Sequence, residues 1–477
     1  MYMRNLTMLT DLYQLTMMYG YYKSGMRNNL ATFDMFYRSK DATTHYAIAA
    51  GLEQLIEYFR NLHFEEDSIA YLRNLNIFDE DFLNELRNFK FHGDVYAVPE
   101  GTIVFPHEPL IRVTAPIFEA QLIETALLNI INHQTLIATK ASRVVQAAEG
   151  DSVLEFGLRR AQGPDAGIYG ARAAIIGGCN STSNVLTGQI YNIPIAGTHA
   201  HSWVMSFPDE ITAFRKYAEM FPTSCLLLVD TFDTLRSGVP NAIKVFDELR
   251  AQGHEPVGIR LDSGDLAYLS REARRMLDEA GYPNAKICAS GDLDENLIRD
   301  LKLQGACIDT WGVGTKLITS EDCPSLGGVY KMSAETIDGR VIPKIKISEN
   351  PVKITNPGIK RLYRIYDKDG MAVADLIALE HETYDTSKPL TIYDPVNTWK
   401  SMTLTEYSMK ELLVPVIKGG EIVYNSPTLK EIQQYCREDL ATFWDQYKRI
   451  LNPHTYKVDL SDSLWMLKNS MLQNYRR

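Results

Sequence analysis

The sequence contains no apolar run long enough to cross a membrane and offers no signal peptide. A membrane-spanning helix needs about 20 consecutive, mostly apolar residues, and polar or charged residues interrupt every candidate stretch. The first residues, MYMRNLTMLTDLYQLTMMYGYY, include Asp11 and Gln14 and lack a small-residue cleavage site. We therefore expect a cytoplasmic protein without membrane contact.

Cysteine is scarce and basic residues are outnumbered. Six cysteines are scattered over 477 residues without a CxxC pair, which is typical of reduced, mostly buried thiols in a cytosolic protein. Lysine and arginine number 49 against 60 acidic residues, so the net charge is -11. Such a balance argues against a general nucleic-acid or membrane surface, but it allows a local basic pocket for a phosphorylated small molecule.

Repeats and low-complexity tracts are also missing, and the length suggests two or three domains. Up to about residue 90 the pattern indicates helices with one strand at 31–38. Short β-branched runs at 95–116 predict a small antiparallel unit, and one long helix is expected over 118–150. After residue 319, Lys-rich runs at 326–335, 340–348 and 360–367 predict strands that return to the antiparallel unit, and 431–453 predicts a helix.

Between residues 151 and 319 short apolar strands alternate with amphipathic helices. This βα rhythm predicts a parallel sheet. The stretch has at least five such units and no Rossmann glycine fingerprint, which favours a closed βα barrel over a doubly wound sheet.

Catalytic groups of βα barrels lie at the carboxyl ends of the strands. The predicted strand ends carry a mixture of Arg, His, Asp, Gly and aromatic residues, which suits a flat, anionic, phosphorylated substrate. In chain order they are Phe156, Gly157, Leu158 and Arg159, then Thr198, His199 and His201, then Asp230, Arg260, Asp262, Ser290, Trp311, Gly312 and Gly314.

Two histidines stand out in the run IAGTHAHSWV. If residues 193–201 form a strand, His199 and His201 point the same way. They could bind a metal with Asp230 or Asp262 as a third ligand, as in barrel hydrolases. They could instead form a hydrogen-bonded structural pair, or supply a nucleophile or general base. The residues leave these three alternatives open.

Other strand ends also have plain structural interpretations. Asp265 in RLDSGDL suits the N-cap of the next helix. That role does not explain Arg260 and Asp262, which could bind a phosphate and ribose hydroxyls or Mg²⁺. Gly312 and Gly314 could let the backbone approach a phosphate, although a simple turn also accounts for them.

Taken together, these segments resemble nicotinate phosphoribosyltransferase. The resemblance covers nearly the whole chain in the family's order, through TDLYQLTMMYGY, FDMFYR, EFGLRRAQGPD, GTHAHSWV, VDTFDTLRSGVPNAI, GIRLDSGDL, DTWGVGT and SLGGVYKM. It implies a type II phosphoribosyltransferase fold, an irregular α/β barrel beside an antiparallel-sheet α+β domain. The domains expected are residues 1–125, completed by about 325–365; the catalytic barrel at 126–324; and a carboxyl-terminal segment at 366–477.

The resemblance also implies an activity and a set of roles. Nicotinate and phosphoribosyl pyrophosphate would give nicotinate mononucleotide and pyrophosphate in NAD salvage. ATP would be a co-substrate through a phosphohistidine, and Mg²⁺ a cofactor without assigned protein ligands. The catalytic residues would be His201, which carries the phosphate, and Asp230, which orients it. The substrate-binding residues would be Tyr13, Phe156, Arg159, Ser183, Thr198, Arg260, Asp262, Gly312, Gly314 and Thr315.

A homodimer with shared active sites is expected from the same resemblance, because Tyr13 would reach the barrel of a second protomer. Nicotinamide phosphoribosyltransferase is the near alternative, since it shares several motifs. It carries an acidic residue near the substrate amide, whereas the corresponding GCNSTSNV stretch has Ser183 and Asn184. A missing carboxylate there favours an acidic substrate. The metal-dependent barrel hydrolase stays as a third hypothesis.

Overall fold

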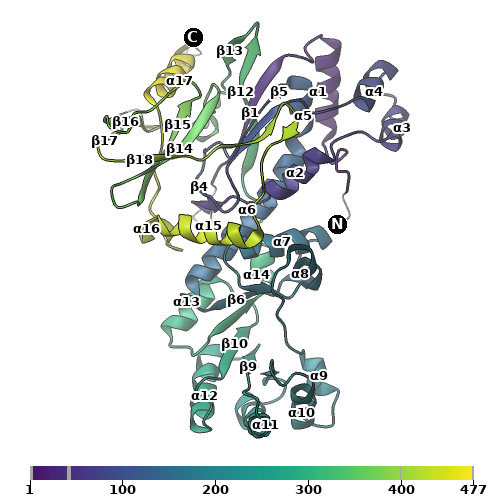
Figure 1. Ribbon diagram of the computed structural model, residues 1–477, viewed down its shortest axis with the longest axis vertical. Coiled ribbons are helices and arrows are strands. Elements are labelled where there is room, and N and C mark those ends of the chain that lie inside the picture. Colours follow the sequence, from purple (N-terminus) through teal and green to yellow (C-terminus); the bar gives the residue numbers. More distant parts are fainter. Residues whose placement is uncertain (1–3, 40–43, 398, 475–477) are drawn as a thin grey trace. The chain divides into compact units, whose positions relative to one another are not determined.

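The structure is a computed structural model that describes residues 4–39, 44–397 and 399–474. It divides into two compact units (Figure 1). The sheet unit combines the chain up to Leu136 with the chain from Ser325 onward, and the barrel unit runs from Ile137 to Pro324. The division falls inside a long helix, α6 (Glu124–Ala147). No helix in the described part is long and apolar enough to cross a membrane.

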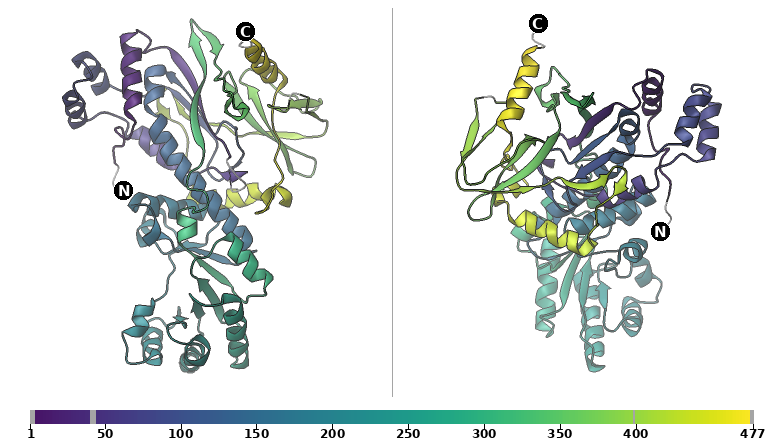
Figure 2. Two further views of the ribbon diagram at one scale, coloured as in Figure 1. Left: turned by 180° about the vertical axis from the view of Figure 1, so that it is seen from behind. Right: turned by 45° about the horizontal axis from the view of Figure 1, so that its top comes forward.

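A seven-stranded antiparallel sheet forms the first layer of the sheet unit, with the order β13-β12-β1-β5-β3-β19-β20. Figure 2 shows that it joins purple strands from the start of the chain to green and yellow strands from its second half. The strand at 31–38 and the antiparallel unit at 95–116 are thereby confirmed. The bounds are β1 (Leu30–Tyr37), β3 (Asp94–Ala97), β5 (Ile111–Pro116), β12 (Gly328–Ile337), β13 (Arg340–Pro343), β19 (Val414–Lys418) and β20 (Glu421–Ile422), and a separate pair is β2 (Ala47–Ile48) with β4 (Ile103–Val104).

Helices before residue 90 are present as expected, and the long helix predicted further on differs from the structure. The helix expected over 118–150 is two helices, because a turn at Ile123 separates α5 from α6. The helices are α1 (Leu12–Lys23), α2 (Leu52–Arg60), α3 (Glu66–Asn74), α4 (Glu80–Arg87) and α5 (Ile117–Leu122).

A second sheet, of six strands, also belongs to the sheet unit and has the order β17-β16-β21-β15-β14-β18. The prediction that 360–367 returns to the first antiparallel sheet is wrong, because β14 pairs with β15 and β18 here. The helix expected over 431–453 is interrupted after Ala441. The bounds are β14 (Lys360–Tyr366), β15 (Ala372–Leu379), β16 (Leu390–Tyr393), β17 (Ser401–Leu404), β18 (Ser408–Glu411), β21 (Val458–Leu460), α15 (Leu429–Ala441), α16 (Asp445–Lys448) and α17 (Asp462–Asn474).

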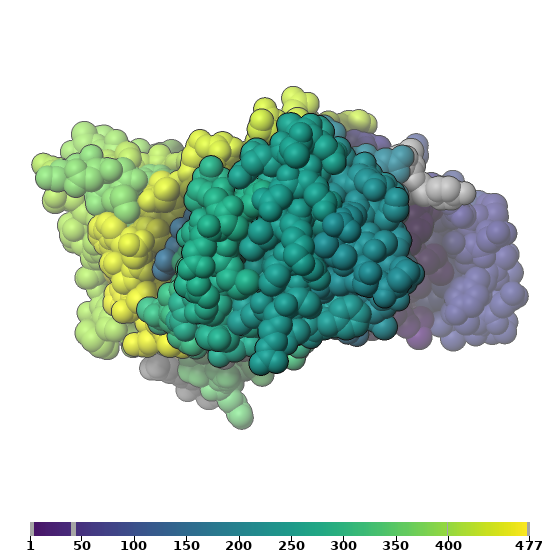
Figure 3. Space-filling view, turned by 90° about the horizontal axis from the view of Figure 1, so that it is seen from below, coloured from purple at the N-terminus to yellow at the C-terminus, as the bar shows by residue number. Residues whose placement is uncertain are grey.

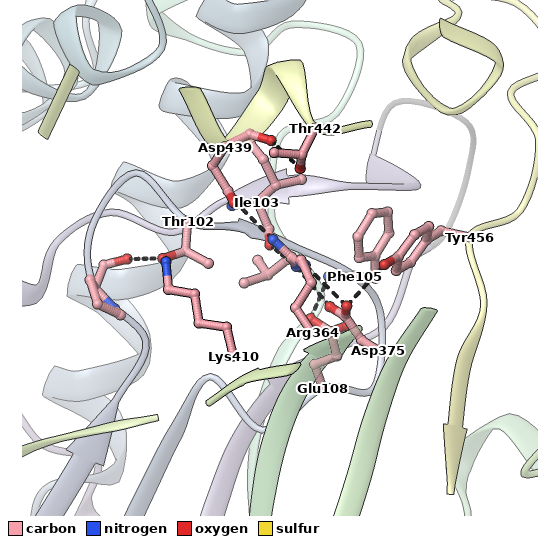
Figure 4. A network of polar contacts seen from close by, with 12 residues as sticks. Thr102, Ile103, Phe105, Glu108, Arg364, Asp375, Lys410, Asp439, Thr442 and Tyr456 are labelled. Carbon is pink, nitrogen blue, oxygen red and sulfur yellow. Dashed lines mark hydrogen bonds and ion pairs between the residues drawn. The ribbon is translucent and has the colours of Figure 1, made fainter. Parts of the chain in front are cut away.

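A fully buried arginine ties the elements of the sheet unit together (Figure 4). Arg364 on β14 donates to both carboxylate oxygens of Asp375 on β15, at 3.0 and 2.7 Å, and to Asp439 on α15, at 2.9 Å. It also donates to the Ile103 carbonyl of β4 at 2.6 Å, and the Ile103 N–H donates to Asp439 at 2.8 Å. Two strands of one sheet, a helix and β4 therefore meet at one guanidinium.

The barrel unit contains a six-stranded parallel sheet in the order β7-β6-β11-β10-β9-β8. An isolated bridge from Thr182 to Ile195 adds the next segment of chain beside β7. The order is therefore that of a ring with one seam, between this segment and β8, and the predicted fold class of an irregular βα barrel with a separate antiparallel-sheet region is confirmed. The strands are β6 (Ser152–Glu155), β7 (Ser181–Thr182), β8 (Leu226–Leu228), β9 (Gly258–Leu261), β10 (Lys286–Ser290) and β11 (Thr310–Val313).

Helices follow the strands of the barrel unit as the βα rhythm predicts. The teal and green surface in Figure 3 belongs to this unit. Asp265 accepts a hydrogen bond from the Tyr268 N–H at 3.0 Å and is the N-cap of α12, as expected. The helices are α7 (Pro164–Ile176), α8 (Val185–Tyr191), α9 (His201–Met205), α10 (Glu210–Met220), α11 (Val239–Ala251), α12 (Leu266–Glu279), α13 (Glu295–Leu303) and α14 (Thr315–Ile318).

Replacing Arg364 with methionine should strongly destabilise the sheet unit. The substitution leaves the buried carboxylates of Asp375 and Asp439 without their cation, which costs about 3–5 kcal/mol in comparable cases. Arg361→Met on the same strand is the control, because Arg361 pairs with Glu411 where both side chains are 32% exposed, and exposed pairs contribute about 1 kcal/mol or less. Urea unfolding would measure both, and equal losses would contradict the assignment.

Candidate active site

Polar side chains from several strand ends of the barrel unit converge on one guanidinium. Arg260, on β9, donates from Nη1 to the Thr198 hydroxyl at 3.0 Å and from Nε to the Ser290 hydroxyl at 2.8 Å. Its Nη2 donates to Asp262 Oδ1 at 2.8 Å. Three side chains from separate segments thus hold the planar fork in one orientation.

The Asp262 carboxylate is kept ionised by this arrangement. Burial alone would raise its pKa, but hydrogen bonds from Ser290 and Arg260, together with the Arg260 charge, lower the pKa below its ordinary value. The side chain remains 29% exposed. A partly open, ionised carboxylate next to a fixed guanidinium can accept hydroxyl groups or approach a cation.

His201 and Asp230 form the second constellation. His201 Nε2 lies 3.2 Å from Asp230 Oδ1, and the carboxylate is 2% exposed whereas the imidazole is 38% exposed. Asp230 Oδ2 accepts from the Asp262 N–H at 2.8 Å and from the Ser263 hydroxyl at 2.6 Å. Because a carboxylate accepts, Nε2 carries the donated proton, and in the neutral form of this ring Nδ1 then has the lone pair.

The two histidines do not share a strand face, contrary to the sequence-based expectation. Only an isolated bridge forms at Ile195, next to Pro194, which has no N–H for a ladder. Ala200 then acts as the N-cap of α9, and His201 is the first residue of that helix. The two rings therefore point to different partners.

His199 serves the seam of the barrel. Its Nε2 accepts the Leu228 N–H of β8 at 3.3 Å, and its ring packs edge-on against Tyr217 at 4.7 Å. Burial lowers the pKa of His199 to about 4, so the ring is neutral and able to accept. No group of three or more His, Cys, Asp or Glu side chains in the described ranges is arranged to bind a metal.

Phe156 lies close to Gly312 and Arg260, two other predicted site residues. A Cβ at Gly312 would come within 2.7 Å of Phe156 Cδ2, so the missing side chain makes room for the ring. The Arg260 Cζ lies 5.8 Å from the ring centroid. Gly314 follows β11 and precedes Thr315, the first residue of α14, whereas the Trp311 indole is buried and donates to Asp151 at 3.0 Å.

The remaining barrel residues lie near the same strand ends with different roles. Arg159 is exposed in a short 3₁₀ turn, Leu158–Arg160. Ser183 is half-buried, and its N–H donates to the Glu155 carbonyl at 2.9 Å. Asn184, expected beside Ser183 in the substrate loop, instead caps α8, because its Oδ1 accepts the Thr187 N–H at 3.2 Å and its amide donates to Gly167.

Tyr13 belongs to the sheet unit, whereas the other predicted site residues belong to the barrel unit. It lies in the first turn of α1 and is 46% exposed. Burial, followed by the charge of Glu124, raises the pKa of Tyr13 to about 12, and the Gln14 amide donates to its hydroxyl at 3.3 Å. The phenol therefore stays protonated at neutral pH.

Sequence reasoning missed a basic cluster in the sheet unit. Burial lowers the pKa of Lys331 and, against the pull of Glu124, the charges of Lys346 and Arg38 lower it further. The charges of Lys346 and Arg38 therefore act on Lys331, which also lies 3.9 Å from Glu124 Oε1; basic side chains of this kind can bind phosphate groups. The Lys-rich strands were visible in the sequence, but their meeting with Arg38 depends on the pairing of β1 with β12.

Comparison with known proteins identifies the family of this chain. The family models for the amino-terminal and carboxyl-terminal domains of nicotinate phosphoribosyltransferase match residues 8–132 and 359–468. The nicotinate phosphoribosyltransferase of Bacillus subtilis is 49% identical over 97% of this chain and 94% of its own length. The human nicotinate phosphoribosyltransferase is 32% identical over 97% of this chain and 96% of its own.

Solved structures support the same family. The crystal structure of human nicotinic acid phosphoribosyltransferase superposes with a TM-score of 0.85 at 30% identity, over 97% of this chain and all (100%) of that one. A nicotinate-nucleotide pyrophosphorylase from Pyrococcus furiosus, 23% identical with a TM-score of 0.71 over 93% of this chain and 98% of its own, shares the fold. The relatives span the barrel residues as well as both matched domains, and the chain belongs to the nicotinate phosphoribosyltransferase family.

Proposed function

We propose that this protein joins nicotinate to phosphoribosyl pyrophosphate, giving nicotinate mononucleotide and pyrophosphate in NAD salvage, and couples the reaction to ATP through a phosphohistidine at His201. Family membership supports the transferase activity. The observation that carries the ATP-coupled part is the 3.2 Å contact between His201 Nε2 and the buried Asp230 carboxylate. That contact prepares one imidazole, and only its Nδ1, as a nucleophile.

The phosphoryl step follows from this geometry. Asp230 holds the Nε2 proton, so the Nδ1 lone pair attacks the γ-phosphorus of ATP while the bond to the leaving ADP oxygen breaks. The Asp230 carboxylate stabilises the positive charge that develops on the ring. Its second oxygen is held by the Asp262 N–H and Ser263, so the carboxylate need not reorganise during the step.

The barrel residues are suited to the second substrate pair. Phe156 would stack on the pyridine ring, with Tyr13 on its other side, and such contacts contribute roughly 0.5–1.5 kcal/mol beyond area burial. Arg260 and Thr198 would face the ring or phosphates, Asp262 the ribose hydroxyls, and Arg159 the pyridine substituent. The backbone at Gly312, Gly314 and Thr315 would receive the 5′-phosphate.

Chemistry then occurs at the ribose carbon. The pyridine nitrogen forms a bond to C1 as the bond to pyrophosphate breaks, through a transition state with oxocarbenium character. Basic side chains stabilise the departing negative charge. The Lys331, Lys346 and Arg38 cluster carries the right charge for such a role, on the same unit as Tyr13.

Mg²⁺ fits the donor set. Mg²⁺ prefers oxygen ligands and commonly takes only one or two carboxylates together with substrate phosphates, and Asp262 offers an ionised, partly exposed carboxylate. Asp262 would hold the ion, which would neutralise charge on the pyrophosphate. ATP and Mg²⁺ are therefore both parts of the proposal.

Nicotinate is favoured over nicotinamide by the lack of a carboxylate at Ser183. With Asn184 committed to capping α8, Ser183 alone remains of the two residues first considered. A carboxylate at this position would repel an acidic substrate. The metal-dependent hydrolase loses support, because His199 uses its nitrogen on the barrel backbone.

A homodimer with shared sites is part of the proposal. Leu12, Tyr13 and Met17 of α1 are 55, 46 and 38% exposed, and an exposed apolar helix face needs a cover. The barrel mouth of a second protomer would cover it and receive Tyr13. We also propose a cytosolic location, which the six cysteines support, since none of them forms a disulfide.

His201→Ala should abolish ATP stimulation of nicotinate mononucleotide formation, because no other imidazole nitrogen in the described ranges is prepared by Asp230. His199→Gln is the matched control, since its amide oxygen can still accept the Leu228 N–H and it should keep ATP stimulation. Product formation would be measured chromatographically from nicotinate and from nicotinamide, each with and without ATP. Persistent stimulation in the His201 variant, or a preference for nicotinamide in the wild type, would contradict the proposal.

Mixing inactive Tyr13→Ala with inactive His201→Ala protein should restore activity if sites are shared. A heterodimer then has one site with both residues intact, so it regains up to about half of a wild-type dimer's activity by counting sites in a two-fold dimer. Each variant incubated alone under the same exchange conditions is the control. Without recovery, and with exchange proven by differently tagged chains, each site would be built within one chain.

A further inference from the structure

A fully buried carboxylate lies directly beside the proposed pyridine site and has no part in the mechanism above. Glu155 is the last residue of β6 and is 0% exposed. Its Oε2 accepts the Thr182 hydroxyl at 2.6 Å, and its Oε1 accepts the Gly157 N–H. Its backbone carbonyl accepts the Ser183 N–H at 2.9 Å. One residue therefore joins the ends of β6 and β7.

No cation among the described residues explains this burial. Burial raises the pKa of Glu155, while the hydrogen bonds from Thr182 and Gly157 lower it, and no charged group of the described part contributes. Burying a carboxylate without a cation costs free energy. The two hydrogen bonds that Glu155 accepts are therefore the evident role of this side chain. The Glu155 charge also adds to burial in raising the pKa of the Cys179 thiol.

The turn above Glu155 is built tightly around it. A Cβ at Gly157 would lie 2.8 Å from Glu155 Oε1 and 2.5 Å from the Ile318 Cβ of α14. Only glycine lets the backbone N–H come down onto the carboxylate while α14 packs from the other side. The hydrogen bond to the carboxylate oxygen thus fixes the position of the Phe156–Gly157 turn relative to the Glu155 side chain.

Two proposed pyridine contacts depend on the groups that Glu155 holds. Phe156 precedes Gly157, and its ring occupies the space left by Gly312. Ser183 follows Thr182, whose hydroxyl also accepts the Asn184 N–H at 3.0 Å. A shift of the turn or of the β7 end would therefore move the ring or the substituent contact.

We propose that Glu155 is a positioning residue for the pyridine substrate, holding the Phe156–Gly157 turn and the Thr182–Ser183 strand end in register through its two carboxylate oxygens. The inference rests on the proposed function, since it takes Phe156 and Ser183 as pyridine contacts. The proposed role depends on the length and shape of the Glu155 side chain rather than on its charge.

Two conservative variants separate reach from charge. Glu155→Asp keeps the charge but is one methylene too short to accept from both Thr182 and Gly157. Glu155→Gln keeps the length, because its amide oxygen can accept the Gly157 N–H and its amide can donate to the Thr182 hydroxyl. Glu155→Asp should raise the KM for nicotinate roughly tenfold, which corresponds to about 1.4 kcal/mol and lies within the range of one lost hydrogen bond. Glu155→Gln should change it by only about twofold.

The KM for phosphoribosyl pyrophosphate and the thermal midpoint are measured on the same proteins. Asp151→Asn is the control, because Asp151 precedes the opposite end of β6 and accepts from Trp311 and Lys302. It should lower the thermal midpoint without a selective change in the KM for nicotinate. A selective rise in that KM in Glu155→Asp supports the inference.

Three results would overturn it. The first is that Glu155→Gln is the more damaging variant, which would show that charge matters. The second is that neither variant changes the KM for nicotinate. The third is that the KM values for nicotinate and for phosphoribosyl pyrophosphate rise together, as in a general loss of stability. Because wild-type turnover of nicotinate is measured in the same series, failure of the proposed function is recognised separately, by an inactive wild type.

Discussion

The Arg260 guanidinium is the constraint on which the arrangement of the site depends. Its three hydrogen bonds, to Thr198, Asp262 and Ser290, join the loop before α9 to the ends of β9 and β10. Hydrogen bonds to a charged group contribute about 1.5–3 kcal/mol each, enough to hold a loop that has almost no strand pairing of its own. With Thr198 held in place, His199 lies at the seam of the barrel and His201 lies next to Asp230. The Asp262 N–H donates to Asp230 and so connects the contacts of Arg260 to those of His201.

The two histidines show how one short loop serves both fold and chemistry. His199 is buried and neutral, and it replaces a missing strand partner by accepting the Leu228 N–H. His201, two residues later, is more exposed and faces a buried carboxylate. A structural role therefore fits His199, and the reactive role is the one proposed for His201. Spacing alone could not divide them, because the turn between them is not a strand.

Much of this could be predicted from the sequence where local pattern decides the outcome. The βα rhythm gave the barrel strands, and the residue type before a helix identified Asp265 as its N-cap. Non-local features failed: 193–201 forms only an isolated bridge at Ile195, next to Pro194, which lacks an N–H for a ladder, and β14 joined another sheet because periodicity does not identify the partner of a strand. Gly312 was expected to approach a phosphate, but it also makes room for Phe156. Glu155, an acidic residue between apolar neighbours, gave no signal beyond its place before Phe156.

The central claim is that Asp230 prepares His201, and not His199, to carry a phosphoryl group. The most direct test incubates the protein with Mg²⁺ and ATP, digests it at neutral to alkaline pH to preserve phosphohistidine, and maps the phosphate by tandem mass spectrometry. The account predicts phosphate on His201, much less of it in Asp230→Asn, and none on His199. Phosphate on His199, or an undiminished level on His201 in the Asp230 variant, would contradict it.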